Sequence, residues 1–217
     1  MINPADFDIT PPERCEPVAR IVDDEAPVRE SLSFNLRIAG IRTRVFESAE
    51  DFLENDDNRH PGCVVLDIRM PGMSGLELQD EMIRRSMDLP ILFLTGHGDI
   101  GMAVSALKKG AGDFLEKPGD PAAIRERVAK LMEQNVAARR DRFVRGMLRE
   151  RFERLTDREK EVIRRVAADQ LNKVIAIDLD IQEHTVKIHR ANACRKLGVR
   201  SALEVHRFLA AIGEIDE

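Results

Sequence analysis

The 217-residue sequence contains no tryptophan and no tyrosine. Proteins that bind single-stranded nucleic acid stack its bases on aromatic side chains, so this absence argues against such a platform. Cysteine is scarce, and the three present, Cys15, Cys63 and Cys194, lie far apart without Cys-x-x-Cys spacing. That pattern excludes a disulfide framework and a cysteine-based zinc site, and it is typical of proteins in the reducing cytoplasm.

Long apolar runs are also absent. No run exceeds about five residues, whereas a membrane-spanning helix needs about 20. The sequence therefore predicts neither a membrane span nor a signal-peptide core, and we expect a cytoplasmic protein. Apolar residues make up 43% of the chain, which is enough for packed cores, and the length predicts one or two domains.

The two signs of charge are unevenly distributed along the chain. Residues 1–120 contain 13 basic and 23 acidic residues, a net charge of −10. Residues 121–217 contain 21 basic and 16 acidic residues, a net charge of +5. The acidic half can hold a cation and the basic half can meet a polyanion, but two solvated surfaces of unlike sign would give the same charges. Charge alone leaves both interpretations open.

Residues 18–118 alternate short apolar runs with amphipathic segments. We expect strands at 18–22, 41–46, 63–66, 91–94 and 113–116. Helices are expected between them at 27–39, 48–53, 75–85 and 102–109. The third of these should bury Leu76, Leu78, Met82 and Ile83. Because the strand runs are almost wholly apolar, both faces of the sheet must be covered, which predicts an α/β fold with a doubly wound, five-stranded parallel sheet.

Polar residues follow these strands where each one ends. They are Asp23, Asp24, Asp67, Thr95 and Lys117. The carboxyl ends of parallel strands meet at one edge of a sheet, so we expect these side chains to gather there. Carboxylates crowded together repel unless a cation lies among them, and oxygen ligands without histidine or cysteine suit Mg²⁺.

This set of groups has the chemistry of phosphoryl transfer. A carboxylate at a strand tip, such as Asp67, can attack phosphorus and become an acyl phosphate. The reaction mainly needs positioning and charge neutralisation, which Mg²⁺ and the Lys117 ammonium can provide on two sides. The Thr95 hydroxyl can then donate a hydrogen bond to a phosphoryl oxygen.

Residues 18–118 resemble the receiver domain of two-component response regulators. Four segments carry the resemblance, each at an expected strand end: Asp23-Asp24-Glu25, Leu66-Asp67-Ile68-Arg69-Met70-Pro71-Gly72-Met73-Ser74-Gly75, Thr95-Gly96-His97-Gly98-Asp99 and Phe114-Leu115-Glu116-Lys117-Pro118. The resemblance implies a flavodoxin-like receiver that is phosphorylated on Asp67 by a sensor histidine kinase. It implies Mg²⁺ bound by Asp23, Asp24, Asp67 and the backbone carbonyl of Arg69, with Lys117 on the phosphate.

The resemblance also implies which residues transmit the phosphorylation signal, and it implies that the protein is not an enzyme. Thr95 and Phe114 would form the switch, and the receiver would catalyse only its own phosphotransfer and dephosphorylation, so the protein is not an enzyme. Phosphatases of the haloacid-dehalogenase type also use an aspartate nucleophile and Mg²⁺. They need a second aspartate two residues later as general acid, and this chain has Arg69 there. We therefore set the phosphatase interpretation aside.

The back half is expected to be helical throughout. Residues 121–152 predict a long linker helix, which has fewer than three clean heptads of a coiled coil. Thr156 and Glu159 have capping-box spacing, and further helices are expected from Asn172, over 183–197, and after Ser201. Between Glu183 and Glu204 no acidic residue occurs, whereas five basic ones do. This excess of basic residues is what a helix in a DNA groove, flanked by phosphates, requires. A solvated basic helix on a protein surface would have the same pattern.

Residues 155–207 resemble the LuxR/FixJ-type DNA-binding domain. The matching segments are Leu155 to Glu159, Asn172 to Ala176, Thr185 to Arg190 and Lys196 to Ser201. With the receiver, they identify the chain as a member of the FixJ subfamily. The resemblance implies a four-helix domain with a helix-turn-helix that binds double-stranded promoter DNA as a dimer, and RNA polymerase as a further partner. Base contacts would come from Lys187, Ile188 and Ala191, and phosphate contacts from Lys173, Thr185 and Arg195.

The predicted organisation is a flexible tail at 1–16, a receiver at 17–120, a linker helix at 121–152 and a DNA-binding domain at 153–217. Two routes of activation stay open: phosphorylation dimerises receivers through the surface of helix 102–109 and strand 113–116, or it releases an inhibitory contact.

The alternative function is that of a phosphorylation-controlled interaction module, whose basic domain docks on another protein instead of on DNA. Salt dependence of DNA binding separates the two, because phosphate contacts give a steep slope.

Overall fold

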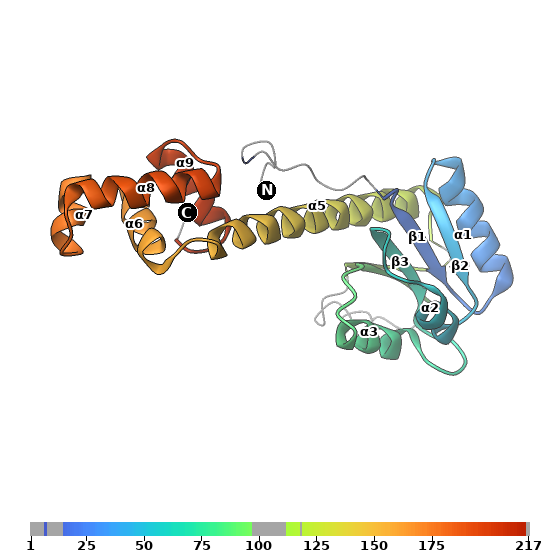
Figure 1. Ribbon diagram of the computed structural model, residues 1–217. Coiled ribbons are helices and arrows are strands. Elements are labelled where there is room, and N and C mark those ends of the chain that lie inside the picture. Colours follow the sequence, from blue (N-terminus) through green and yellow to red (C-terminus); the bar gives the residue numbers. More distant parts are fainter. Residues whose placement is uncertain (1–6, 8–14, 97–111, 118, 216–217) are drawn as a thin grey trace. The chain divides into compact units, whose positions relative to one another are not determined.

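The computed structural model in Figure 1 describes residues 7, 15–96, 112–117 and 119–215. The chain divides into two compact units, each of which is described by itself. We call residues Arg14–Arg139 the sheet unit, and residues Arg140–Glu217 together with Met1–Glu13 the helical unit.

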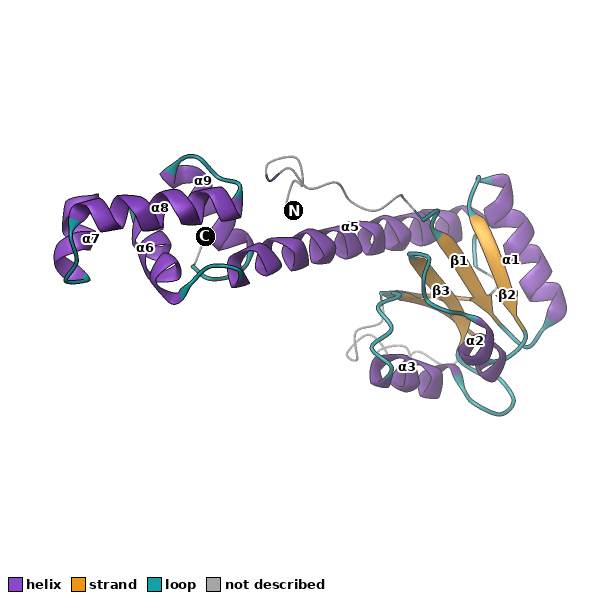
Figure 2. Cartoon of the chain, viewed as in Figure 1, coloured by secondary structure: helices purple, strands orange, loops and turns teal. Residues whose placement is uncertain are grey.

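Five parallel strands form the sheet of the sheet unit, in the order β2-β1-β3-β4-β5. The strands are β1 (Val18–Val22), β2 (Arg42–Phe46), β3 (Gly62–Asp67), β4 (Ile91–Thr95) and β5 (Asp113–Glu116). The helices described in this unit are α1 (Ala26–Ile38), α2 (Ala49–Asn55), α3 (Gly75–Arg84) and the first part of α5 (Pro121–Glu153), shown in Figure 2. The predicted α/β class and parallel sheet are confirmed. The helix predicted at 102–109 lies outside the described residues.

Helices cover both faces of this sheet, as its apolar strands require. Alternate strand residues such as Ala19, Ile21 and Val65 pack against α1 and α5. Their neighbours along the strands, such as Val64 and Leu66, pack against α2 and α3. Each large apolar side chain that is fully buried in this way stabilises the fold by about 1.5–3 kcal/mol.

The predicted burial of one residue of α3, Ile83, is wrong. Leu78 and Met82 are buried as expected, but the side chain of Ile83 is 56% exposed. Ile83 follows Met82 directly, and one residue turns a helix by about 100°, so the two cannot share a narrow face. The buried face is instead widened by Gln79, which is 2% exposed.

A charged residue lies in the centre of the sheet unit. The Arg20 side chain on β1 is fully buried and donates a hydrogen bond from Nε to Oδ2 of Asp56 at 2.8 Å. Its Nη2 atom donates to the carbonyl of His60 at 2.9 Å. The side chain thereby fixes the connection between α2 and β3. Breaking such a pair leaves a buried charge uncompensated, which typically costs about 3–5 kcal/mol.

The long helix α5 contributes to both units. Ile124, Val128 and Leu131 pack on the sheet, and the side chain of Asn135 accepts from Gly62 N at 2.9 Å. Arg139 forms an ion pair with Asp88. The last part of the helix adds its apolar side chains to the core of the helical unit; these are Val144, Leu148 and Phe152.

In the described part of the helical unit, four further helices follow α5, as predicted. They are α6 (Asp157–Ala167), α7 (Asn172–Asp178), α8 (Glu183–Leu197) and α9 (Ala202–Ala211). Thr156 and Glu159 form the predicted capping box, and Ser201 accepts from Glu204 N. Gly198 ends α8 in the left-handed conformation, with φ +76°. No helix in the described part of the chain is both long and apolar enough to cross a membrane.

Candidate metal centre and nucleic-acid interface

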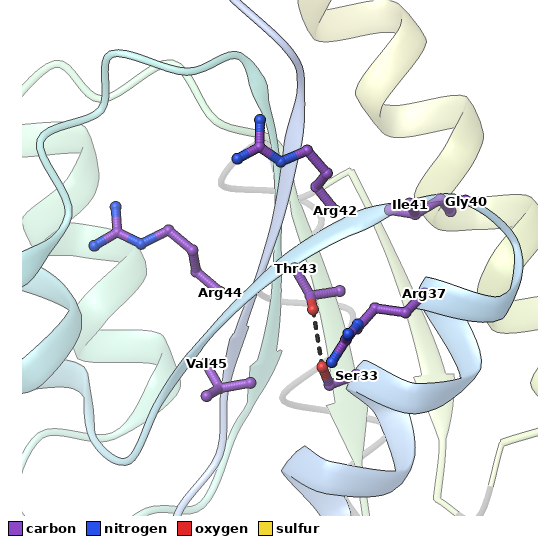
Figure 3. A pocket seen from close by; sticks show the side chains of 8 residues that line it. All are labelled: Ser33, Arg37, Gly40, Ile41, Arg42, Thr43, Arg44 and Val45. Carbon is purple, nitrogen blue, oxygen red and sulfur yellow. Dashed lines mark hydrogen bonds between the residues drawn. The ribbon is translucent and has the colours of Figure 1, made fainter.

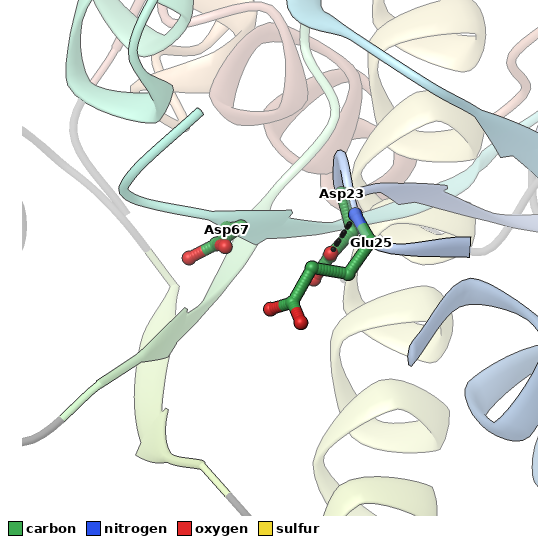
Figure 4. Close-up of side chains that lie close together, drawn as sticks. All are labelled: Asp23, Glu25 and Asp67. Carbon is green, nitrogen blue, oxygen red and sulfur yellow. Dashed lines mark hydrogen bonds between the residues drawn. The ribbon is translucent and has the colours of Figure 1, made fainter. Parts of the chain in front are cut away.

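Two buried carboxylates lie side by side at the carboxyl edge of the sheet. Asp67 ends β3, and Asp23 follows the end of the neighbouring strand β1. Their residues are 7% and 1% exposed. Together with exposed Glu25, they bring carboxylate oxygens to within 4.8 Å of one another, as Figure 4 shows. The turn after β1 is held by the N–H of Glu25, which donates to Oδ1 of Asp23 at 2.9 Å.

Lys117 places its ammonium group between these two carboxylates. The Nζ atom donates to Oδ2 of Asp23 at 2.7 Å and to Oδ2 of Asp67 at 2.8 Å. Burial by itself lowers the pKa of the Lys117 ammonium, but its hydrogen bonds to the two carboxylates outweigh burial and raise this pKa. The lysine is therefore a cation at neutral pH, placed to contact any anion that joins Asp67.

The loop after Asp67 is folded tightly against its own backbone. A side chain at Gly75 would place its Cβ atom 2.1 Å from the carbonyl oxygen of Asp67, so only glycine fits there. Gly72 has φ +74°, which also favours glycine. Oε1 of Glu50 on α2 accepts from the N–H of Met73 at 2.9 Å, and backbone hydrogen bonds lower the pKa of this carboxyl. Glu50 has no local sequence signal for this role, because its partner Met73 is 23 residues away.

The structure gathers some of the predicted site residues and leaves out others. Asp23, Asp67 and Lys117 come together, and the N–H of Arg69 donates to Oδ1 of Asp67 at 3.3 Å. Asp24 is exposed, and Glu25 takes the third place in the cluster. The Asp-Asp-Glu run contained that signal, but the sequence interpretation did not use its third residue.

The predicted switch residues lie on adjacent strands. Phe114 on β5 is half-buried and packs against the core shared by α2 and α3. Thr95 ends β4 and pairs in register with Glu116, but its side chain lies outside the described part of the chain.

The donor set of this cluster suits a hard divalent cation. All its ligand atoms are carboxylate oxygens, two of the three carboxylates are buried, and they converge from two strand ends. Mg²⁺ prefers such oxygens, usually takes only one or two from the protein, and keeps several waters. The residues present therefore fit the metal that the sequence predicts.

A groove elsewhere on the sheet unit lacks comparable chemistry. It has a volume of about 650 Å³ and lies between α1 and the edge strand β2 (Figure 3). Its polar wall includes the hydroxyls of Ser33 and Thr43, which hydrogen-bond to each other at 2.8 Å. None of the carboxylates that surround Lys117 lines this groove.

The helix α8 has one buried face and one exposed face. Val186, Ala193 and Leu197 are buried in the core of the helical unit. The predicted base-contacting residues, Lys187, Ile188 and Ala191, are all exposed. Ile188 is 47% exposed, so its apolar side chain is accessible on this face.

The predicted phosphate-contacting residues lie on α7 and α8. Lys173 and Arg195 are exposed, and Thr185 is half-buried in the first turn of α8. Lys187 pairs with Glu183 of its own helix at 2.9 Å, an exposed ion pair with which a DNA phosphate can compete. The N-terminus of α8 has no side-chain cap, so its first N–H groups point to a place where an anion is favoured.

Two family models match the chain, one for each unit. The response regulator receiver domain matches residues 19–129, and the luxR family of bacterial regulatory proteins matches residues 153–209. Transcriptional regulatory protein FixJ of Rhizobium meliloti is 42% identical over 193 residues, which is 89% of this chain and 95% of FixJ. Response regulator protein TodT of Pseudomonas putida is 43% identical over 195 residues, 88% of this chain and 84% of TodT.

Solved structures of response regulators are also similar to this chain. The response regulator StyR has a TM-score of 0.81 and 41% identity, and the match covers 89% of this chain and 98% of StyR. Full-length FixJ from B. japonicum has a TM-score of 0.58 and 35% identity, with coverage of 93% and 99%.

Proposed function

The chain belongs to the response regulators that join a receiver domain to a LuxR-type DNA-binding domain, and on that premise we propose that Asp67 is its phosphoacceptor. Members of this family regulate transcription under the control of phosphorylation, so the chain is a regulator rather than an enzyme. The observation that supports Asp67 is its place at the tip of β3, buried beside Asp23 and bonded to Lys117.

The proposed reaction is the transfer of a phosphoryl group from a histidine of the sensor kinase. An oxygen of Asp67 attacks phosphorus, a P–O bond forms, the P–N bond breaks, and the imidazole leaves with its electron pair and takes up a proton. The ionised carboxylate of Asp67 can only accept hydrogen bonds, and the Lys117 ammonium keeps a positive charge beside it during the transfer. The receiver catalyses only this transfer and the later hydrolysis of its own acyl phosphate.

We further propose that Mg²⁺ binds at Asp23, Asp24, Asp67 and the backbone carbonyl of Arg69. Glu25 joins this proposal because its carboxylate lies in the cluster with Asp23 and Asp67. The bound metal would neutralise charge on the transferred phosphoryl group. Burial of Asp23 keeps this neutralisation in a medium of low dielectric constant, where it is stronger than in water.

Activation is proposed to pass from Asp67 to the DNA-binding domain through Thr95 and Phe114. The half-buried ring of Phe114 would move inward when the Thr95 hydroxyl is drawn to the phosphoryl group. The result is either dimerisation of receivers, through helix 102–109 and β5, or release of an inhibitory contact. A dimer would place two α8 helices about one DNA turn apart, which favours a two-fold site.

The DNA surface is proposed to be the exposed stripe of α8. Lys187, Ile188 and Ala191 would read base edges, and Lys173, Thr185 and Arg195 would bind phosphates. RNA polymerase is the proposed further partner, and the cytoplasm the proposed location. The proposed domain limits are 1–16 for the tail, 17–120 for the receiver, 121–152 for the linker and 153–217 for DNA binding.

Labelling with a small acyl-phosphate donor tests the phosphoacceptor. Asp67→Asn replaces a nucleophilic oxygen with an amide and should abolish Mg²⁺-dependent labelling while the fold is kept. Asp57→Asn is the matched control, because the Asp57 side chain is 52% exposed and lies outside the cluster. The proposal fails if Asp67→Asn is labelled as fast as Asp57→Asn.

A further inference from the structure

We propose that Phe7, which precedes the whole receiver domain in the sequence, is an anchor that docks on the DNA-binding unit and completes its core. The ring is 7% exposed and belongs to the same apolar cluster as Val144, Leu148 and Phe208. It meets Phe208 of α9 edge-on, with the ring centroids 5.8 Å apart and an interplanar angle of 82°. That is a favoured geometry for an aromatic pair.

The backbone at Phe7 is held as well as the ring. Nη1 of Arg151 on α5 donates to the carbonyl oxygen of Phe7 at 2.8 Å, and it also lies 3.4 Å from the carbonyl oxygen of Leu197. Leu197 is the last residue of α8. One guanidinium therefore joins the N-terminal anchor to the end of the proposed DNA-contacting helix. Hydrogen bonds of this kind, with a charged donor, are stronger than neutral ones.

The sequence around Phe7 suits this place. Phe7 is the only aromatic residue among residues 1–33, and acidic residues stand on both sides of it at Asp6 and Asp8. Residues 121–217 carry a net charge of +5. An acidic segment with one aromatic side chain is therefore attracted to this half of the chain and has one residue suited to its apolar core.

A docked Phe7 adds a residue from before the receiver to the DNA-binding unit. Phe7 belongs to the helical unit, although the residues of the sheet unit lie between it and the rest of that unit in the sequence. The stability of the DNA-binding unit then depends on a residue that precedes the receiver in the sequence. The prediction of residues 1–16 as a flexible tail did not anticipate a buried ring at Phe7.

The absence of tryptophan and tyrosine allows a direct test in the full-length protein. Phe7→Trp introduces the only indole of the chain. We expect blue-shifted emission and at least threefold weaker quenching by acrylamide than in Phe34→Trp. Phe34 is the matched control because its side chain is 68% exposed on α1 of the other unit. Emission of Phe7→Trp like that of a free indole, equal to the control, counts against the anchor.

A second variant covers the case in which the larger indole does not fit. Phe7→Ala removes the ring, and hydrogen exchange in the full-length protein then reports each segment separately. We expect amides of α8 and α9 to exchange at least tenfold faster, while β1 and β3 keep their protection. Phe34→Ala should leave α8 and α9 unchanged. Unchanged exchange of α8 and α9 in Phe7→Ala overturns the proposal, whatever the indole of Phe7→Trp reports.

Discussion

The Nζ atom of Lys117 lies 2.8 Å from Oδ2 of Asp67 and 2.7 Å from Oδ2 of Asp23. One ammonium thus compensates two buried carboxylates that would otherwise repel each other. A metal ion in the same cluster brings a second source of positive charge close to this ammonium. The lysine should therefore weaken metal binding, even though it assists the chemistry at Asp67.

Removing the ammonium should move these two properties in opposite directions. In Lys117→Met, Mg²⁺ should bind about tenfold more tightly, which is about 1.4 kcal/mol, because the carboxylates lose their competing cation. Labelling of Asp67 by an acyl-phosphate donor should become at least tenfold slower. Calorimetric titration with Mg²⁺ at constant ionic strength measures the first effect. Lys130→Met, an exposed site on α5, is the control, and weaker Mg²⁺ binding in Lys117→Met would contradict this account.

The hydrogen bond from Met73 to Glu50 predicts a positioning role in the same site. Glu50→Leu removes the acceptor that holds the loop after Asp67, so labelling of Asp67 should slow by about tenfold, since a misplacement of about 1 Å can cost up to a hundredfold. Glu50→Gln keeps an acceptor oxygen and should restore most of the rate. Glu54→Leu, at an exposed position of the same helix, is the control. Equal rates in Glu50→Leu and Glu54→Leu would show that Glu50 does not position the loop.

The strands and their polar ends could be predicted because each signal is local. A strand buried on both faces has a continuous apolar run, and the residue that ends it, such as Asp67, falls at the functional edge of a parallel sheet. Caps such as Thr156 are equally local, because the side chain bonds to a backbone group three residues away. The exposed and buried faces of α8 follow from its 3.6-residue period.

Features that depend on distant partners could not be predicted. Arg20 stands in a central strand where apolar residues are expected, and its partner Asp56 is 36 residues away. The choice between Asp24 and Glu25 depends on the turn after β1, where strand periodicity has ended. Phe7 had no local signal of burial, because its contacts with Arg151 and Phe208 span most of the chain.

The exposed face of α8 predicts the effect of removing one cation. Lys187→Ala should weaken DNA binding by about 1–3 kcal/mol and reduce the slope of log affinity against log salt by about one. Arg158→Ala is the control, because Arg158 lies on α6 and is paired with Glu161. Measuring the DNA affinity of both variants over a range of salt concentrations gives the affinity and the slope. If both variants keep the wild-type affinity and slope, the DNA surface lies elsewhere.

The buried carboxylate of Glu159 ties the start of α6 to the end of α8. Glu159 is 4% exposed, and its Oε2 atom accepts from Lys196 Nζ at 2.6 Å and from Thr156 N at 2.8 Å. Burial alone raises the pKa of this carboxyl, but the bonds from Lys196 and Thr156 outweigh burial and lower it below 4.5. The ionised form is therefore the one that stabilises the helical unit.

This shift sets the pH range in which Glu159 acts. Because its pKa is lower in the folded than in the unfolded state, its contribution to stability is present above about pH 4.5 and is lost as the pH falls through the folded-state value. At pH 7, Glu159→Gln should reduce the free energy of unfolding of the helical unit by about 1.5–3 kcal/mol. The deficit relative to wild type should shrink in acid, where wild-type Glu159 also becomes neutral. Glu161→Gln, 47% exposed on the same helix, should show no such pH-dependent deficit. Hydrogen exchange of α6 and α8 at pH 7 and near pH 4, corrected for intrinsic exchange rates, measures the stability of both variants. If the loss of stability in Glu159→Gln is as large near pH 4 as at pH 7, the stabilising interaction does not involve the ionised carboxylate.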